Sequence, residues 1–360
     1  MIHTLIMAGG VGSRFWPKSR AQKPKQFLNL VGETSLIRQT YDRIVPLGSA
    51  DNTLVITNDA YCDMVAEEIP ELPNQNIIGE VVGRNTAPCV ALAAAVVSKK
   101  DPEGVIVVLP SDHFVRNEDK YREIISSAAK KAAEGSHLLT VGIAPNRPET
   151  GYGYIQYNDK KKTDSDGNPV YLVKTFAEKP DLETAMHFLN SGDFLWNSGM
   201  FVWRADTILN EFKKWLPEIH KELELVTPHL GTKNQKAAID RYFSRCISIS
   251  VDYGIMEKTD AVHVIPGDFG WSDVGSWMAV YELAEKDNTG NVLHAKKPIV
   301  VDSQNCYLES NSEKLIGLVG LQGLTVVETD DALLICRSDA SQSVKDLYNA
   351  LDTDAYKTYK

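Results

Sequence analysis

A short apolar segment at the N-terminus runs directly into a glycine turn, and this junction constrains the fold more than any other feature of the chain. The segment Ile2–Met7 has the character of a buried strand. It is followed, with no polar transition, by Gly9, Gly10 and Gly12. Because glycine has no Cβ, the chain can adopt positive φ angles there and bring backbone N–H groups against an anion. The junction therefore predicts a strand that ends in a tight loop with an exposed backbone.

The residues behind this turn are strongly basic in a chain that is acidic elsewhere. The formal net charge of the 360 residues is −10, yet no Asp or Glu occurs in residues 1–32. Five cations lie in this stretch: Arg14, Lys18, Arg20, Lys23 and Lys25. Their density matches the charge of one nucleoside triphosphate, and we predict a phosphate-binding loop. The alternative is a solvated basic loop after a surface turn, which the adjacent glycines disfavour.

Two familiar phosphate-binding fingerprints fail at this loop. Gly10-Val11-Gly12 opens the dinucleotide-binding pattern, but Phe15 occupies its third glycine position. No Gly-Lys-Ser/Thr sequence follows, so the loop is not a P-loop. An NAD(P)H-dependent oxidoreductase therefore stays only as a remote alternative, which a fluorescence assay of NAD(P)H binding would reveal.

Composition bounds the remaining possibilities. With 43% hydrophobic residues, a chain of 360 residues is ample for one large domain and an appendage. The negative net charge argues against nucleic-acid and membrane-surface partners, because these require a dominant positive field. The longest apolar run, Val90–Val97, is too short to span a bilayer, and the N-terminus shows no export signal. The five cysteines form no Cys-x-x-Cys pair, so we expect reduced thiols and a cytoplasmic protein.

Strand-like and helical segments alternate as far as Leu139, and this alternation predicts βαβ units and a parallel sheet. The strand-like segments are Ile2–Met7, Leu54–Thr57, Ile77–Ile78 and Val105–Leu109, and the helical ones are Leu36–Ile44, Tyr61–Glu68, Ala87–Val97 and Tyr121–Ala133. Thr86 is a plausible N-cap for the third of these helices. Beyond Leu139, strands at Tyr152–Tyr157 and Tyr171–Ala177 indicate a mixed sheet. A polar turn with the lysines at 160–162 and Gly167 separates them, and the lysine run is expected at a solvated hairpin tip.

The pattern changes again from about Lys296, where short apolar runs alternate with polar turns. The runs are Ile299–Val301, Cys306–Leu308, Leu315–Val319, Leu324–Val327 and Ala332–Cys336. They predict a small all-β unit, closed by a helix at Val344–Leu351. We place a large domain at residues 1–288 and the C-terminal unit at 289–360, with the boundary inside Lys286–Lys297.

Two aspartates follow apolar strands, where open parallel sheets bind their ligands. Asp112 comes after Val105–Leu109, and Asp273 lies in a Gly-Trp-Ser-Asp-Val-Gly sequence after Ala261–Ile265. Two carboxylates are the minimal protein contribution for Mg²⁺ on a triphosphate, because Mg²⁺ keeps waters and phosphate oxygens as its other ligands. Each aspartate alone would be interpreted as a turn or cap residue. Together with the basic loop, they predict a metal site.

Seven motifs, in order, give the chain a resemblance to the sugar-1-phosphate nucleotidyltransferases, and specifically to the mannose-1-phosphate guanylyltransferases, or GDP-mannose pyrophosphorylases. They lie at Gly9–Leu28, Arg84–Pro88, Pro110–His113, Gly151–Ile155, Phe176–Pro180, Trp196–Met200 and Trp271–Gly275. Any one motif is weak, but seven in order over nearly the whole chain are highly specific. The resemblance implies an α/β fold: a Rossmann-like mixed central sheet of nucleotide-diphosphosugar transferase type, followed by a left-handed β-helix-like unit.

The same resemblance implies an enzyme that transfers GMP from GTP to mannose 1-phosphate, with Mg²⁺ as cofactor and pyrophosphate as the leaving group. By similarity, Gly9, Gly10, Gly12 and Arg14 hold the triphosphate, Lys25 stabilises the reacting α-phosphate, and Asp112 and Asp273 hold Mg²⁺. The resemblance also places Arg84, Asn85 and Thr86 near the nucleoside, Gly151, Glu178 and Asn197 at the sugar, and Lys179 at its phosphate.

Substrate identity, further domains and assembly are left open by these residues. A guanylyltransferase for another sugar 1-phosphate fits the same pattern, as does a non-catalytic nucleotide-sugar sensor, although a sensor should lack a metal carboxylate or the loop lysine. Some family members carry a downstream isomerase domain of cupin type; we expect none here because the chain ends at Lys360. Short stacked strands leave an apolar flank for a partner, so we expect a homodimer.

Overall fold

The computed structural model describes all residues 1–360, and their contacts group them into two units that the chain enters more than once. Unit 1 consists of Met1–Gly9, Thr40–Ser111 and Val115–Trp271, and unit 2 of Gly10–Gln39, Asp112–Phe114 and Ser272–Lys360. The basic loop behind the glycine turn therefore groups with Ser272–Lys360, the C-terminal segment that we call the tail. The boundary between residues 288 and 289 stays a prediction.

Unit 1 is built on a nine-stranded sheet with the order β3-β2-β1-β4-β9-β6-β10-β8-β7. Its strands are β1 (Ile2–Ala8), β2 (Thr53–Asn58), β3 (Ile77–Glu80), β4 (Val105–Pro110), β6 (Leu138–Ile143), β7 (Tyr154–Ser165), β8 (Asn168–Ala177), β9 (Phe194–Arg204) and β10 (Val262–Pro266). The four strands from β3 to β4 are mutually parallel, whereas β9 is antiparallel to both β4 and β6. This arrangement confirms the predicted mixed central sheet.

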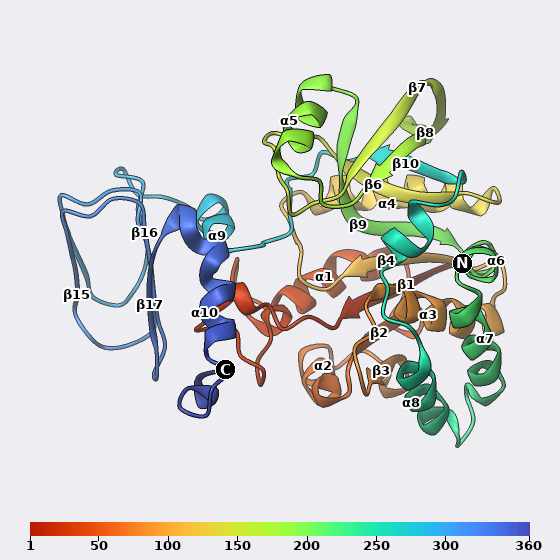
Figure 1. Cartoon of the computed structure of the whole chain (residues 1–360), viewed down its shortest axis with the longest axis horizontal. Helices are drawn as coiled ribbons and strands as arrows, with labels where there is room; N and C mark the ends of the chain where they lie inside the picture. The colour runs from red at the N-terminus through yellow and green to blue at the C-terminus, as the bar shows by residue number, and fades with distance from the viewer. The chain divides into compact units, whose positions relative to one another are not determined.

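Helices cover both faces of this sheet. The helices up to this point of the chain are α1 (Leu36–Ile44), whose residues are divided between the two units, α2 (Cys62–Glu68), α3 (Thr86–Lys100), α4 (Glu118–Ala133), α5 (Leu182–Ser191), α6 (Ala205–Trp215), α7 (Pro217–Val226) and α8 (Gln235–Arg245). Of these, α7 packs mainly on α3, α6 and α8 rather than on the sheet itself. Alternate residues of β4 divide between two apolar clusters: Ile106 and Val108 pack with α3, and Val107 and Leu109 pack with α4 (Figure 1). Because successive strand residues point to opposite faces, a strand covered on both sides is apolar throughout.

Two local predictions in unit 1 were wrong. The lysines at 160–162 lie exposed within β7, and the hairpin tip is formed by Asp166 and Gly167, with φ angles of 52° and 81°. An Asp-Gly pair adopts these positive φ angles readily, so it determines the turn in place of the charged run. The N-cap of α3 is Asn85, whose side chain accepts from the Thr86 backbone N–H; Thr86 is the first helical residue.

The last residue of β3, Glu80, is a buried carboxyl with 7% of its surface exposed. Burial raises the pKa of Glu80 from its ordinary value of 4.5 to about 7. The folded chain therefore binds this proton more tightly than the unfolded chain does. As pH rises from 4.5 to about 7 the folded state loses stability, by about 3 kcal/mol once the carboxyl is ionised.

We therefore expect Glu80→Gln to raise the free energy of unfolding at pH 8, by up to about 3 kcal/mol. The gain should disappear near pH 4, where the carboxyl is protonated in both the folded and the unfolded state. Urea unfolding at pH 4, 6 and 8 measures the effect, with Glu67→Gln on the exposed face of α2 as the matched control. If Glu80→Gln raised the free energy of unfolding by the same amount at all three pH values, the effect would not come from ionisation of Glu80.

The tail of unit 2 forms stacked parallel strands, drawn in blue in Figure 1. Its elements are α9 (Trp277–Leu283), β12 (Val292–His294), β13 (Pro298–Val301), β14 (Tyr307–Ser310), β15 (Ile316–Val319), β16 (Leu324–Glu328), β17 (Leu333–Arg337) and α10 (Val344–Ala350). One stack is β12-β14-β16, extended by the antiparallel β17, and the other is β13-β15. Two parallel stacks that recur along the chain are typical of a β-helix, which confirms the predicted C-terminal unit.

The short strands β5 (Phe114–Val115) and β11 (Trp271–Ser272) lie where the chain passes between the units. No helix combines the length and apolar character needed to cross a membrane.

Candidate active site

Unit 2 contains a cavity of about 270 Å³ that gathers five of the predicted site residues. Three come from the basic loop, Gly12, Arg14 and Lys25, and two are the aspartates Asp112 and Asp273. The remaining lining residues are Ser13, Phe15, His113, Gly275 and Lys345. Segments some hundreds of residues apart in sequence therefore meet in one cavity that carries both cations and carboxylates.

Lys25 lines this cavity, although only 5% of its surface is exposed. Its Nζ lies 2.9 Å from Asp112 Oδ2 and donates to the Asp273 backbone carbonyl at 2.7 Å. Gly12 leaves room for it: a Cβ at Gly12 would lie 2.2 Å from Lys25 Cβ, and the φ of Gly12 is +74°. Both the backbone angle and the close approach thus require glycine at this position.

The carboxylate of Asp112 is kept ionised by its neighbours. Burial alone would raise the pKa of Asp112, but the charges of Lys25 and His113, together with the Lys25 hydrogen bond, hold it below its ordinary value. The group is therefore anionic at neutral pH and can bind a cation.

Asp273 is positioned by a strained backbone. The next residue, Val274, is fully buried and has a φ of +46°, which is unfavourable for a β-branched side chain. Gly275 completes the turn. A glycine is required at this position because a Cβ there would lie 2.8 Å from Asp273 Oδ2. Strain of this kind persists only where the surrounding structure enforces it, and it is concentrated at functional sites.

The loop that carries Arg14 and Lys25 is fixed by the tail of the same unit. Trp16 Nε1 donates to the Tyr359 carbonyl at 2.8 Å, and Lys18 Nζ pairs with Glu309 at 2.6 Å. Burial would raise the pKa of Glu309, but the His294 hydrogen bond and the Lys18 charge lower it to about 2. Arg20 pairs with Asp331 at 2.7 Å. Contacts with the tail therefore hold the basic loop in place.

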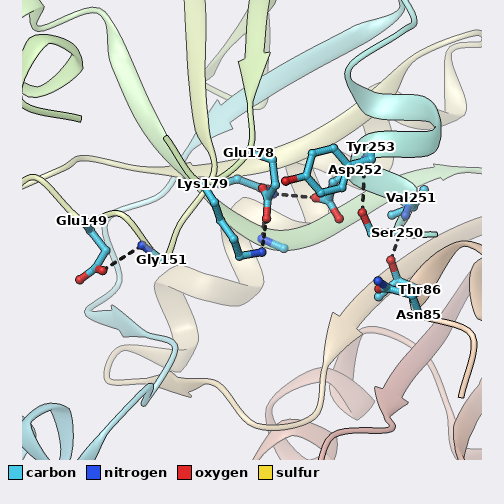
Figure 2. Close-up of polar contacts among 12 residues, drawn as sticks. Asn85, Thr86, Glu149, Gly151, Glu178, Lys179, Ser250, Val251, Asp252 and Tyr253 are labelled. Carbon is cyan, nitrogen blue, oxygen red and sulfur yellow. Dashed lines mark hydrogen bonds and ion pairs between the residues drawn. The ribbon is translucent and has the colours of Figure 1, made fainter. Parts of the chain in front are cut away.

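Unit 1 brings together the residues predicted to bind the sugar phosphate (Figure 2). Lys179 Nζ reaches the carboxylate of Glu178 at 2.5 Å, and Asp252 lies next to Glu178. The amide of Asn197 donates to Asp252 Oδ1 at 2.9 Å. Lys179 has a φ of +51°, a further strained non-glycine residue. These contacts place a cation beside two carboxylates and an amide, a set suited to hydroxyl and phosphate groups.

Asp252 and Glu178 are electrostatically coupled. Burial, and secondly the charge of Glu178, raise the pKa of Asp252 to about 6, and the Asn197 hydrogen bond opposes this rise. One oxygen of Glu178, Oε2, is buried without a hydrogen-bond partner. A Cβ at Gly153 would lie 2.4 Å from this oxygen, so the glycine makes room for the carboxylate. An unpaired buried acceptor is a natural partner for a ligand hydroxyl.

Three other predicted residues are used in contacts within unit 1. Arg84 donates to the backbone carbonyls of Phe243 and Ser244, and Thr86 Oγ1 accepts from the Val251 N–H. Asn85 has a φ of +62° and caps α3 (Figure 2). Their side chains are thus fixed by the protein, and their role at the nucleoside stays a prediction.

Of the remaining predicted glycines, Gly151 donates its backbone N–H to Glu149 Oε1 at 3.1 Å. A Cβ at Gly9 or Gly10 would meet no atom within 4 Å. No contact within the chain therefore requires glycine at these two positions, and their role at the triphosphate also stays a prediction.

Known proteins resemble this chain over its whole length. A nucleotidyl transferase family model matches residues 3–290, and a mannose-phosphate isomerase/GMP-like β-helix domain model matches residues 296–351. A mannose-1-phosphate guanylyltransferase from Klebsiella pneumoniae is 42% identical over 363 residues, covering 100% of this chain and 76% of the relative. One from Escherichia coli is also 42% identical, with the same coverage of both chains. The chain is a member of the mannose-1-phosphate guanylyltransferase family of nucleotidyltransferases.

Structural comparison agrees with this family assignment. A crystal structure from Thermus thermophilus, named a mannose-1-phosphate geranyltransferase, superimposes with a TM-score of 0.86 at 30% identity. The superposition covers 98% of this chain and 99% of that one. The predicted family, enzyme class and fold are therefore confirmed.

Membership of this guanylyltransferase family accounts for the seven motifs, yet two residues at the sites lie outside all of them. Asp252 begins a π-helical turn, Asp252–Met256, and such turns are frequent at functional sites. Lys345 lies on α10, far along the sequence from the basic loop, although both line the same cavity. Neither has a local sequence signal: one is an isolated aspartate between apolar residues, and the other an ordinary lysine in a short helix.

Proposed function

We propose that this family member transfers GMP from GTP to mannose 1-phosphate and releases pyrophosphate. The observation that carries the proposal is the cavity of unit 2, where Arg14, Lys25, Asp112 and Asp273 line one space. Both of the guanylyltransferase relatives described above are named for mannose 1-phosphate as the acceptor.

In the proposed reaction, an oxygen of the sugar 1-phosphate attacks the α-phosphorus of GTP. A new bond forms between this oxygen and the α-phosphorus, while the bond from the α-phosphorus to the bridging oxygen of pyrophosphate breaks. The attacking oxygen is already ionised, so no general base and no covalent enzyme intermediate are required. Catalysis then depends on alignment and on cations beside the developing charge, which Lys25 and Arg14 supply.

Asp112 and Asp273 have the chemistry required to hold Mg²⁺. Both line the cavity, and the lowered pKa of Asp112 keeps its carboxylate ionised. The chain contains no group of three or more His, Cys, Asp or Glu that could hold a metal ion. A two-carboxylate site suits Mg²⁺, which takes its other ligands from water and phosphate. Bound there, Mg²⁺ would neutralise phosphate charge and polarise the reacting phosphoryl group.

On the sugar side, Lys179 supplies the cation for the phosphate, and Glu178 and Asn197 supply polar groups for the hydroxyls. The unpaired Glu178 Oε2 supports this assignment, because a ligand hydroxyl would satisfy it. Asp252, through its bond to Asn197, is proposed as a positioning residue for the amide.

A substrate matrix tests the proposed function. Purified protein is incubated with each nucleoside triphosphate and each sugar 1-phosphate in the presence of Mg²⁺, and pyrophosphate release is measured. We expect the highest kcat/KM for GTP with mannose 1-phosphate. A higher value for another sugar 1-phosphate would revise the acceptor, and GTP binding with no turnover for any acceptor would favour a sensor.

We further propose that the chain forms a homodimer through the outer face of β13 and β15. Ile299, Val301 and Val319 are exposed there by 51, 45 and 65%, and all three point away from the tail core. Contiguous exposed apolar side chains of this kind mark protein interfaces. We expect light scattering at micromolar concentration to give the mass of a dimer and Val319→Glu to give a monomer. A monomeric wild-type protein would contradict this proposal.

A further inference from the structure

We propose that Lys345, on helix α10 of the tail, binds the β- and γ-phosphates of GTP and the pyrophosphate formed from them. The inference rests on the proposed function, which places a triphosphate in the unit 2 cavity. It makes the β-helix-like tail part of the active site, because one of the phosphate-binding cations comes from its last α-helix.

The position of Lys345 is the first observation. Lys345 lines the same cavity as Arg14, Lys25, Asp112 and Asp273. It is exposed, and its ammonium group takes part in no hydrogen bond or ion pair within the chain. An unpaired cation at the wall of the cavity proposed to hold a triphosphate is available to that anion at no cost in broken contacts.

The backbone of Lys345 is held in place, because α10 is packed against the rest of unit 2. The flanking residues Val344 and Tyr348 are buried in the apolar cluster that also contains Phe15 and Trp16 of the basic loop. The helix that presents Lys345 is therefore fixed to the segment that presents Arg14. Such packing places both cations at the same cavity before any ligand arrives, which reduces the entropic cost of binding.

Comparison with the other tail lysines points the same way. Lys296 and Lys297 pair with Glu313, Lys314 pairs with Glu328, and Lys360 pairs with Asp352. Lys286 donates to two backbone carbonyls. Only Lys345 and Lys357 have no polar partner, and only Lys345 lies at the cavity.

The pairing of the cavity cations assigns Lys345 to the β- and γ-phosphates, which leave as pyrophosphate. Lys25 is already engaged by Asp112 and by the Asp273 carbonyl, so it lies beside the two residues proposed to hold the metal. Under the proposed function it therefore serves the α-phosphate, which leaves the outer phosphates to other cations. Arg14 and Lys345 are the cavity cations that stay unpaired. The β- and γ-phosphates carry most of the charge of GTP, and they are the groups that leave as pyrophosphate.

Three variants test this assignment. Lys345→Met removes the charge and keeps the chain length, Lys345→Arg keeps the charge, and Lys357→Met removes the other unpaired tail lysine as a matched control. Forward kinetics give KM for GTP and for mannose 1-phosphate, and reverse kinetics give KM for pyrophosphate and for GDP-mannose. Calorimetric titration of inorganic tripolyphosphate, in the absence of sugar phosphate, measures binding without turnover.

We expect Lys345→Met to raise KM for GTP and for pyrophosphate by about 10- to 100-fold, the usual worth of a hydrogen bond to a charged group. KM for GDP-mannose and for mannose 1-phosphate should change by less than about threefold, since neither substrate contains the β- and γ-phosphates of GTP. The second phosphate of GDP-mannose is that of mannose 1-phosphate. The affinity of Lys345→Met for tripolyphosphate should fall by the same factor by which its KM for GTP rises. Lys345→Arg should restore most of this affinity, and Lys357→Met should bind tripolyphosphate as tightly as the wild type does.

Wild-type KM for GTP and pyrophosphate in Lys345→Met would overturn the inference, as would an equal rise in KM for all four substrates. The titration separates this failure from failure of the proposed function. If the wild type binds tripolyphosphate more tightly than Lys345→Met does but turns over no sugar phosphate, Lys345 keeps its role and the proposed reaction is wrong. Equal tripolyphosphate affinities would instead reject Lys345, whatever the activity.

Discussion

Replacing Lys25 with alanine should lower kcat by about two to three orders of magnitude, the loss typical of removing one preorganised donor from a site of developing negative charge. The proposed reaction builds charge on the oxygens of the α-phosphorus, and Lys25 is a buried cation that lines the cavity. Its Nζ is fixed by Asp112 at 2.9 Å and by the Asp273 carbonyl at 2.7 Å, so it requires no reorganisation during the reaction. Steady-state pyrophosphate release measures the loss.

The same substitution should shift the pH profile of the remaining activity. In the wild type, the Lys25 charge is one of the groups that hold the pKa of Asp112 below its ordinary value. Without Lys25 that pKa rises, so activity that depends on ionised Asp112 should be lost at a higher pH on the acidic side.

Lys25→Met and Lys23→Ala serve as controls. The methionine retains the aliphatic stem that contacts Gly12, so it separates the loss of charge from the loss of packing. Lys23 lies two residues earlier in the same loop, is exposed, and does not line the cavity. If Lys25→Met kept a near-normal kcat, Lys25 would have no role at the reacting phosphorus.

The Asp273→Asn substitution is expected to lower kcat/KM by about 10²- to 10³-fold and to raise the Mg²⁺ concentration needed for half-maximal rate, because an amide is a weaker ligand than a carboxylate for a hard cation. Asp273 is a cleaner test than Asp112. Its contact with Lys25 is through the backbone carbonyl, which the substitution leaves in place, whereas Asp112→Asn also removes the carboxylate partner of Lys25.

Measurements of Mg²⁺ dependence complete this test. Initial rates are taken over a range of Mg²⁺ concentrations for the wild type, Asp273→Asn and Asp268→Asn, an exposed aspartate that does not line the cavity. Chelation of divalent metal should abolish wild-type activity. Activity that survived thorough chelation, or an unchanged Mg²⁺ requirement in Asp273→Asn, would contradict the proposed metal site.

Local sequence patterns predicted most of the elements, because these depend on interactions between near neighbours. The run Leu36–Ile44 is helical with the predicted bounds, and Val105–Leu109 lies within β4. The apolar runs of the tail each correspond to a short strand. Periodicity determines such elements because burial of one face is repeated along the segment itself. The lysine run does not form the hairpin tip, because the positive φ angles of Asp166 and Gly167 place the turn after β7.

The arrangement of the candidate site depended on tertiary structure more than the helices and strands did. The motifs named Lys25, Asp112 and Asp273 as members of one site, but only folding brings them into one cavity with an Nζ to Oδ2 distance of 2.9 Å. The strained Val274 has no sequence signal, because its φ of +46° is imposed by its surroundings. Asp252 was missed because an isolated aspartate does not reveal which residues will neighbour it.

The sequence by itself determined the fold class and the family, and it predicted the residues that would carry the chemistry, since these follow from local periodicity and from motifs that occur in order along the chain. Tertiary structure alone decided that a residue of the tail lines the same cavity as the basic loop. Lys345 lies about 320 residues after Lys25, and only the packing of Val344 and Tyr348 against Phe15 and Trp16 brings it to the cavity. Contacts at such separation arise from three-dimensional burial, which no local pattern of residues encodes.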